Sequence, residues 1–349
     1  MISILITGKD GTYDATDFHD TVTLSGDYKQ CSRSLSFNLI EEEGKSVINC
    51  DVGNSVVFKE DDKVLFDGFI VSRQKTTDSP KIQIKCFDRG FYLKKNKGVY
   101  KFSNQTPESI VKKICSDFGI SVGEVATTDV PVSRNFIGVS LYEIIMTAYT
   151  LASEKTKESY LLVFKEDKLC VIEKKVNEST LLIEPGGSLM ASSCTESIEN
   201  MINQVVIYDK DDKVVKTLKK DELISLYGLM QSYIKQGDDS AETEKKADKI
   251  LEDNGYSQKI TVESLGNSSL ITGGTVVVKE PYTGVCGVFF IDTDTHTWKN
   301  GLYFDKLTLN FKNIMDEKEA GSLPKASSSS GSGTGSLKYN GYVNPPGEE

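Results

Sequence analysis

Alternating apolar and polar residues predict β-strands over residues 1–92. In SRSLSFNLIE the side chains of Leu35, Phe37 and Leu39 recur at every second position, which places them on one face of a strand. The stretch NSVVFKEDDKVLFDGFIVS contains two more strands around the polar turn EDDK, and KIQIKCFD continues the alternation. Short strands separated by turns at this spacing predict a β-sandwich or a barrel.

The pattern changes to a helical period between residues 97 and 188. In QTPESIVKKICSDFGI, Ile110, Ile114 and Phe118 lie on one apolar stripe, which predicts an amphipathic helix. VSLYEIIMTAYTLASEK predicts a second helix, because Ser140 and Glu143 have the spacing of a capping box. The hairpin YLLVFKEDKLCVIEK follows, so this region is expected to be a small α+β unit.

The β pattern returns over residues 195–315, first in MINQVVIYDKDDKVV and later in QKITVESLG, GGTVVVKE, GVFFIDT and LYFDKLTLNF. Two helical segments interrupt it, which predicts a helical insertion at about 220–256. Residues 316–349 are rich in Gly and Ser and predict a flexible linker with a C-terminal tail. The tyrosines of this tail leave two interpretations open, a tethered contact with a neighbouring protein or plain disorder.

An internal repeat connects the two β regions. GNSVVFKE at 53–60 and GGTVVVKE at 273–280 agree at five of eight positions. Each begins with a turn glycine, Gly53 or Gly273, and a second glycine precedes the next apolar strand, Gly68 or Gly287. We therefore expect the same β-domain twice in the chain, with these glycines as structural anchors. A trimer of such chains would present six similar units in a ring.

The net charge, the apolar runs and the cysteines indicate which partners and which compartment to expect. The formal net charge is −10, whereas a nucleic-acid binder normally presents a basic face, so no specific nucleic-acid binding is expected. No apolar run approaches the length of about 20 residues needed to span a bilayer, so no membrane insertion is expected, and the N-terminus shows no secretion signal. The seven cysteines form no CxxC pair and are expected to be buried in a protein made in a reducing cytoplasm.

Catalytic signatures are absent from the sequence. It has no phosphate-binding loop, HExxH, GxSxG or dinucleotide-binding GxGxxG motif. A Ser-His-Asp triad would need His19 or His296, the only histidines. In IDTDTHTWKNG, His296 and Trp298 fall on the same side of an extended chain, and we predict that they anchor a long hairpin or loop. No catalytic residue, cofactor or metal ligand is expected, and the chain is predicted not to be an enzyme.

The C-terminal β region also carries a resemblance to a known family. ITGGTVVV, followed by GVFFIDTDTHTWKNGLYFDKLTLNF, resembles the last barrel of the XkdQ-type hub proteins of contractile phage tails and phage-tail-like bacteriocins. VLFDGFIV, IKCFDR and TPESIVKKICSDFGI resemble the first barrel and the middle domain of that family. The resemblance implies a mainly β fold with α+β parts: two tube-like β-barrel domains, 1–92 and 195–315, flanking a small α+β domain, 97–188.

The same resemblance implies a structural role. Such hubs are similar to the hub of T-even phages, in which a homotrimer with two barrels per chain joins the sixfold tail tube to a threefold spike. The expected partners are therefore two further copies of the chain, a tail tube protein, a spike protein and other baseplate proteins. The expected location is the bacterial cytoplasm during assembly and then the baseplate of the released particle, whether a phage or a bacteriocin.

A cell-wall module is the alternative hypothesis. VYKFSNQTPESIVKKICSDFGISVGEV loosely resembles a glycan-binding LysM unit, in which a strand precedes a short helix, although a clear second half is missing. A peptidoglycan-binding or cell-wall-degrading tail module therefore stays open at the level of the sequence.

Overall fold

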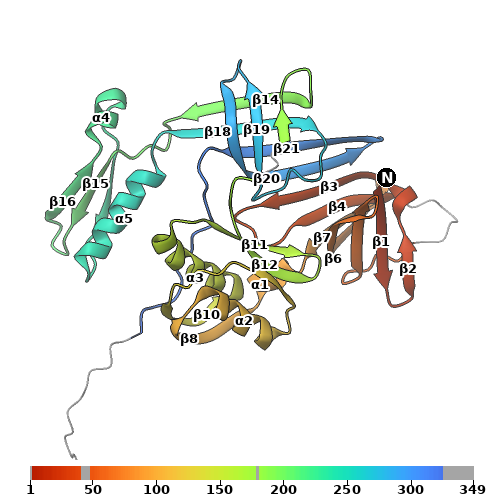
Figure 1. Ribbon diagram of the computed structural model, residues 1–349, viewed down its shortest axis with the longest axis horizontal. Helices are drawn as coiled ribbons and strands as arrows, with labels where there is room; N and C mark the ends of the chain where they lie inside the picture. Colours follow the sequence, from red (N-terminus) through yellow and green to blue (C-terminus); the bar gives the residue numbers. More distant parts are fainter. Residues whose placement is uncertain (1, 41–47, 178–180, 325–349) are drawn as a thin grey trace, which may run out of the picture.

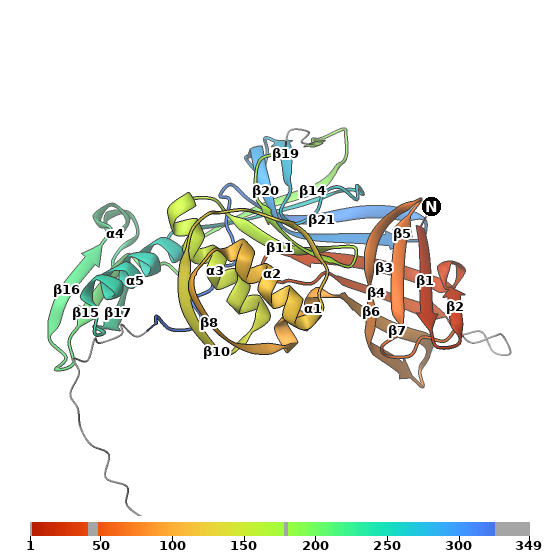
Figure 2. The same ribbon diagram turned by 60° about the horizontal axis from the view of Figure 1, so that its bottom comes forward.

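The computed structural model describes residues 2–40, 48–177 and 181–324, so most of the predicted tail lies outside the described residues. The fold is mainly β, with four separate apolar cores. Figures 1 and 2 show a long sheet with two helical units beside it. No helix in the described ranges is long and apolar enough to cross a membrane.

The first β unit encloses its own core. Leu35, Phe37 and Leu39 are buried, as their alternation predicts, and they pack with Phe58 and Ile84 from other strands. The elements of this unit are β1 (Ile2–Gly8), β2 (Gly11–Asp14), η1 (Thr16–Phe18), β3 (His19–Asp27), β4 (Ser34–Ile40), β5 (Ser55–Glu60), β6 (Lys63–Thr76) and β7 (Ser79–Asp88).

The middle unit is α+β and is built around a buried helix. Its elements are α1 (Gly90–Lys95), β8 (Lys97–Gln105), α2 (Pro107–Phe118), β9 (Val122–Val125), β10 (Val132–Ser140), α3 (Leu141–Thr156), β11 (Tyr160–Lys165) and β12 (Lys168–Glu173). The capping box predicted at the start of α3 is confirmed. The Glu143 amide donates to Ser140 Oγ (3.2 Å), and the Ser140 amide donates to the Glu143 carboxylate (3.3 Å).

The second β unit has a core of its own, centred on Phe289 and Ile291. It consists of β13 (Leu181–Ile183), β14 (Leu189–Ser197), β18 (Ser257–Leu265), β19 (Thr275–Glu280), β20 (Val285–Lys299) and β21 (Leu302–Asn310). Although β13 lies within the predicted middle region 97–188, it pairs in parallel with β19. This short strand therefore belongs to the second sheet.

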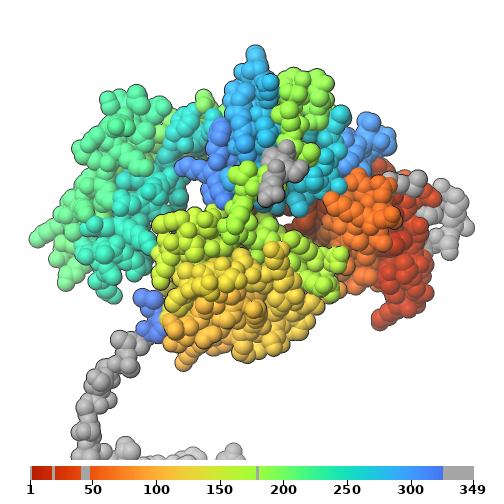
Figure 3. All heavy atoms as spheres, viewed as in Figure 1, coloured from red at the N-terminus to blue at the C-terminus, as the bar shows by residue number. Residues whose placement is uncertain are grey.

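The insertion is larger than the helical segment predicted at about 220–256. It contains β15 (Gln204–Tyr208), β16 (Val214–Lys219), α4 (Asp221–Tyr227), β17 (Gln231–Lys235) and α5 (Ser240–Asp253). The strand within MINQVVIYDK was assigned to the second barrel, but it forms a separate sheet of order β16-β15-β17. The reason is that the thin apolar stripe of α5, Ala247 and Leu251, is buried against Val205 and Ile207. Figure 3 shows this unit standing apart at one side of the molecule.

The two β units share one strand order, which confirms the order of elements in the repeat. The first unit runs β5-β6-β7-β4-β3, and the second runs β19-β20-β21-β18-β14, with antiparallel pairing throughout. A β-bulge also recurs at the same place, between Ile70 and Ser72 in the first unit and between Ile291 and Thr293 in the second.

The two units form a single 13-stranded sheet. Its order along the main path is β14-β18-β21-β20-β3-β4-β7-β6-β5-β1-β2, with β19 and β13 branching from β20. The joint is the pairing of β20 with β3, in register from Thr293 opposite Asp27 to Lys299 opposite Thr21. The repeat predicted two similar units, and this edge-to-edge joint is what the sequence did not predict.

Candidate functional site

The joint between the two β units depends on the length of β20, which spans 15 residues. Its first part, Val285–Phe290, pairs with β19, and after the bulge its second part, Thr293–Lys299, pairs with β3. The IDTDTHTW segment is therefore one arm of a long β20–β21 hairpin, as expected, and it is also a central strand, because β3 pairs with its other edge. His296 and Trp298 do lie on one face of it, as predicted, and that face is buried.

A buried carboxylate ties the two units together at this joint. Asp294 in β20 accepts two hydrogen bonds from the guanidinium of Arg33, at 2.5 and 3.0 Å, and Arg33 lies just before β4. The amide and hydroxyl of Thr272 also donate to Asp294, at 2.7 and 2.6 Å. Opposite Asp294 stands Gly26, where a Cβ atom would lie 2.5 Å from the Arg33 guanidinium and 2.7 Å from Asp294 Oδ1. A side chain at Gly26 would collide with this ion pair.

His296 extends the cluster toward the core of the first unit. Its Nε2 lies 3.2 Å from Asp294 Oδ2, and its Nδ1 lies 2.6 Å from Asp305 Oδ1 and 2.9 Å from the Tyr303 hydroxyl. Burial opposes the charged form of His296, but the contacts with Asp294 and Asp305 outweigh it and raise its pKa to about 9. Burial likewise opposes the charged form of Asp294, but Arg33 and His296 hold its pKa well below the ordinary value. At neutral pH two cations therefore face two anions.

Trp298 belongs to one unit by sequence and to the other by packing. Its ring stacks on Tyr303 (4.3 Å between centroids, 17° between planes) and meets Phe58 of the first unit edge-on (4.9 Å, 75°). Trp298 is thus part of the first core although its strand runs on into the second. The cluster of Arg33, Asp294, His296, Asp305 and Trp298, here called the junction cluster, contains residues from both β units.

Stability is expected to depend on pH through the junction cluster. The pKa of His296 is higher in the folded chain than its ordinary value near 6.5, so its contribution is complete below pH ~6.5 and is lost as pH rises through about 9. The pKa of Asp294 is lowered, so its contribution is lost only in acid. We expect urea midpoints to fall between pH 6 and pH 9.5. In a His296→Gln variant that fall should be smaller; an equal fall in both proteins would show that His296 is not its source.

The junction cluster is closed to solvent. His296 is 1% exposed and Asp294 is fully buried, so a substrate has no path to either side chain. Within the described ranges no group of His, Cys, Asp and Glu could hold a metal ion. The sequence signals that pointed here were His296 and Trp298. Arg33 and Asp305 gave none, because the chain brings Arg33 to Asp294 across 261 positions.

The turn glycines of the repeat fall into two groups. Gly53 and Gly273 both have positive φ, 93° and 88°, and their amides donate to equivalent carbonyls, Ile70 (2.8 Å) and Ile291 (3.0 Å). Gly273 also follows Thr272 directly and so helps to place its hydroxyl on Asp294.

The second pair of glycines is not equivalent. Gly68 stands opposite Val56, whereas Gly287 stands opposite Val278. The equivalent of Gly68 is instead Phe289, which stands opposite Val276, the counterpart of Val56. The turn after β19 is two residues longer than the turn after β5, and a bulge adds one residue to β6 between the pairs of Phe58 and Lys59.

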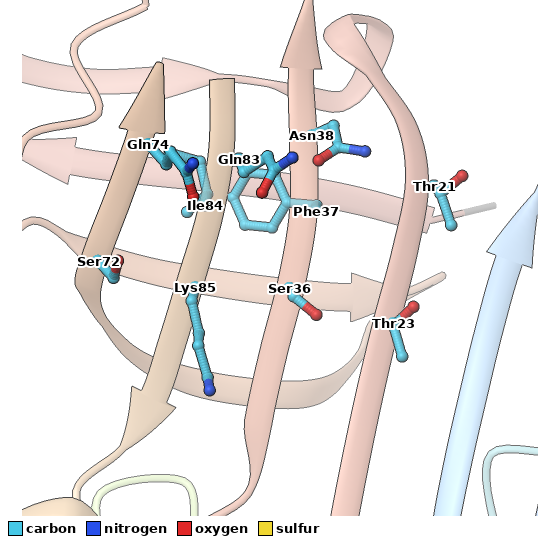
Figure 4. Close-up of a pocket in the computed structure, with 10 residues that line it drawn as sticks. All are labelled: Thr21, Thr23, Ser36, Phe37, Asn38, Ser72, Gln74, Gln83, Ile84 and Lys85. Carbon is cyan, nitrogen blue, oxygen red and sulfur yellow. The ribbon is translucent and has the colours of Figure 1, made fainter. Parts of the chain in front are cut away.

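The other face of the long sheet is polar around the joint. On β3 and β20 it carries small hydroxyl side chains, and Ser25 and Thr295 bond across the joint (3.3 Å). Figure 4 shows a shallow hollow of about 310 Å³ on the first-unit part of this face. The polar side chains that line it are Thr21, Thr23, Ser36, Asn38, Ser72, Gln74, Gln83 and Lys85. Lys85 is the one charged side chain among those that line this hollow.

Comparisons with known proteins agree with this architecture. Residues 22–310 match the YQBQ-like family. The protein XkdQ of the phage-like element PBSX of Bacillus subtilis (strain 168) is 27% identical over 307 residues, which cover 85% of this chain and 94% of that protein.

Two solved structures share the fold. The 43 kDa tail protein of prophage MuSo2 from Shewanella oneidensis has a TM-score of 0.70 at 13% identity, covering 88% of this chain and 98% of its own. An E. coli component of the type VI secretion system, described as similar to the T4 phage tail proteins gp27 and gp5, has a TM-score of 0.53 at 10% identity, with coverages of 88% and 77%. Since the family match spans most of the sequence, the chain belongs to the YQBQ-like family, and it shares its fold with a prophage tail protein.

Proposed function

We propose that this chain is the baseplate hub of a contractile injection particle, a homotrimer that adapts a sixfold tail tube to a threefold spike. One observation carries the proposal: two β units with the same strand order and the same bulge are joined in one sheet within one chain. Three such chains present six similar units on one side while keeping true threefold symmetry on the other. A sixfold ring and a threefold spike can then both find matching surfaces on it.

The proposal keeps a first β unit, residues 1–92, and a second β unit, residues 195–315, with the α+β middle unit between them. Two elements that begin before residue 195, β13 and β14, join the second unit, and the insertion unit interrupts it. The middle unit contacts one end of the polar face, where Phe91 and Tyr92 of α1 stack on Phe87 and Phe69. We assign the middle and insertion units to contacts with other baseplate proteins. We place assembly in the bacterial cytoplasm and the final position in the tail baseplate.

The polar face is suited to line the axial channel. Hydroxyl and amide groups hold water at the surface without binding a passing polymer tightly, and a net charge of −10 disfavours adhesion of nucleic acid. The opposite face is occupied by the two apolar cores and the junction cluster, so it cannot face water. This assignment requires no catalytic group, and the proposed role is structural.

Mass measurement tests the proposal. The chain should have the mass of a trimer, either alone or after mixing with the spike protein encoded with it, and deletion of its gene should yield tubes without spikes. A chain that stays monomeric with both tube and spike proteins would contradict the proposal. Retention on purified peptidoglycan without affinity for either tail protein would favour the cell-wall module.

A further inference from the structure

Of the strand edges in the long sheet that have no strand partner among the described residues, two are related to the joint by the repeat. β20 pairs along one edge with β19 and then with β3. Its counterpart β6 pairs along the same edge only with β5, from Lys63 to Phe69, which leaves Ser72–Thr76 open on that side among the described residues. β14, the counterpart of β3, ends the long sheet and pairs only with β18.

The ladders fix which residues correspond. The shared bulge makes Ser72 equivalent to Thr293, and therefore Arg73 to Asp294 and Gln74 to Thr295. The correspondence of β3 and β14 follows in two steps. Leu35 in β4 and Ile260 in β18 are equivalent, because they pair with equivalent residues of β7 and β21. Leu24 stands opposite Leu35, and Cys194 stands opposite Ile260. Cys194 thus corresponds to Leu24. One and two positions on, Thr195 corresponds to Ser25 and Glu196 to Gly26.

We propose that the second half of β6 pairs antiparallel with β14 of a neighbouring copy, in the register of the joint within the chain. Arg73 then stands opposite Glu196 of the neighbour, and Gln74 stands opposite Thr195. This deepens the proposed function and rests on it, because the occupant of each edge is a second copy of this chain. Each chain contributes eight strands, from β14 to β6. The third chain pairs with the first, so the strands of the trimer close into a ring.

Charge supports this register. Within the chain, the anion Asp294 on β20 meets the cation Arg33 of the other unit, and Gly26 opposite it leaves room. Between chains, the position of Asp294 would hold the cation Arg73 and the position of Gly26 would hold the anion Glu196, so two opposite charges would face each other directly. Both side chains have weaker partners in the lone chain: exposed Asp51 at 2.8 Å from Arg73, and Gln258 at 3.4 Å from Glu196.

The polar face also supports it. Gln74 lines the hollow on this face, and Thr195 continues the hydroxyl rows at the far end of the sheet. Pairing them makes the polar face continuous from one chain to the next, as Ser25 and Thr295 do within the chain. It also covers two open edges, which folded proteins otherwise protect against unwanted pairing.

Cysteine cross-linking tests the register. Gln74→Cys and Thr195→Cys are combined in one chain in which exposed Cys286 is replaced by Ser. Residues directly opposite in antiparallel strands have Cα atoms about 4.5–5.5 Å apart, within reach of a disulfide. Mild oxidation of the trimer, or of purified tails if trimers form only there, should give covalent trimers on a non-reducing gel. Each single variant should give none, and Gln74→Cys with Ser193→Cys, two positions out of register, should give much less.

Trimers by mass that cross-link no better at 74 and 195 than at the shifted pair would overturn this inference and leave the proposed hub intact. Absence of trimers both in solution and in tails would overturn the two together.

Charge reversal gives an independent readout. Arg73→Glu or Glu196→Arg should each raise the dissociation constant of the trimer at least ~10-fold, and the double reversal should recover most of the loss. Asp51→Ala is the matched control, since it removes the partner of Arg73 within the chain and should not weaken the trimer. A double reversal as weak as the single variants would count against the register.

Discussion

Replacing Asp294 by Ala is expected to lower the free energy of unfolding by about 3–5 kcal/mol, the usual cost of removing one partner from a buried ion pair. Without this carboxylate, the Arg33 guanidinium loses both short hydrogen bonds, and protonated His296 keeps only Asp305 as a counter-charge. The amide and hydroxyl of Thr272 also lose their acceptor. Urea denaturation at pH 7, followed by tryptophan fluorescence, measures the loss at the joint itself.

The matched control is Glu263→Ala. Glu263 pairs with Lys306 on the exposed face of the same sheet (2.9 Å), and exposed pairs contribute about 0–1 kcal/mol. The contrast isolates burial, because both changes remove a carboxylate from a neighbouring strand of one sheet. Equal losses in the two variants would mean that the junction cluster does not hold the units together. Separate unfolding transitions in Asp294→Ala would show that the two units had been uncoupled.

Trp298→Ala is expected to cost about 3–5 kcal/mol, as for large aromatic side chains removed from a core. The indole fills the space between Tyr303 and Phe58, and no nearby side chain can take its place without moving a strand. Thermal unfolding followed by circular dichroism measures the effect, since the variant has no tryptophan left to report it. Tyr282→Ala is the control, because Tyr282 is 95% exposed and should change stability by no more than about 0.5 kcal/mol.

The alternative outcome has a distinct meaning. A Trp298→Ala chain with normal thermal stability that fails to enter tail particles would place the indole at an interface between proteins. Such a result would contradict the packing of Trp298 into the first core, and it would leave the junction cluster with the ion pairs of Arg33, Asp294 and His296 alone.

The sequence predicted the repeat well because two copies of one unit preserve the same local pattern. The strand after Gly53 and the strand after Gly273 each return to their partners by the same hydrogen bonds, to Ile70 and Ile291. The alignment was wrong for Gly68 and Gly287, since a glycine before an apolar strand also arises by chance. The strand-pairing registers, and not sequence identity, identify Phe289 as the counterpart of Gly68.

By itself, the sequence determined the strands, the capped helix α3, the order of the repeated elements and the buried side of His296 and Trp298. These features follow from periods of two or 3.6 residues and from short-range hydrogen bonds, which neighbours along the chain fix. Only the tertiary structure decided that β20 pairs with β3, that Arg33 meets Asp294, and that the insertion forms a sheet of its own. Those contacts join residues far apart in the chain. They form because each strand edge needs hydrogen-bond partners and each buried charge needs a counter-charge, and local sequence periodicity does not identify either partner.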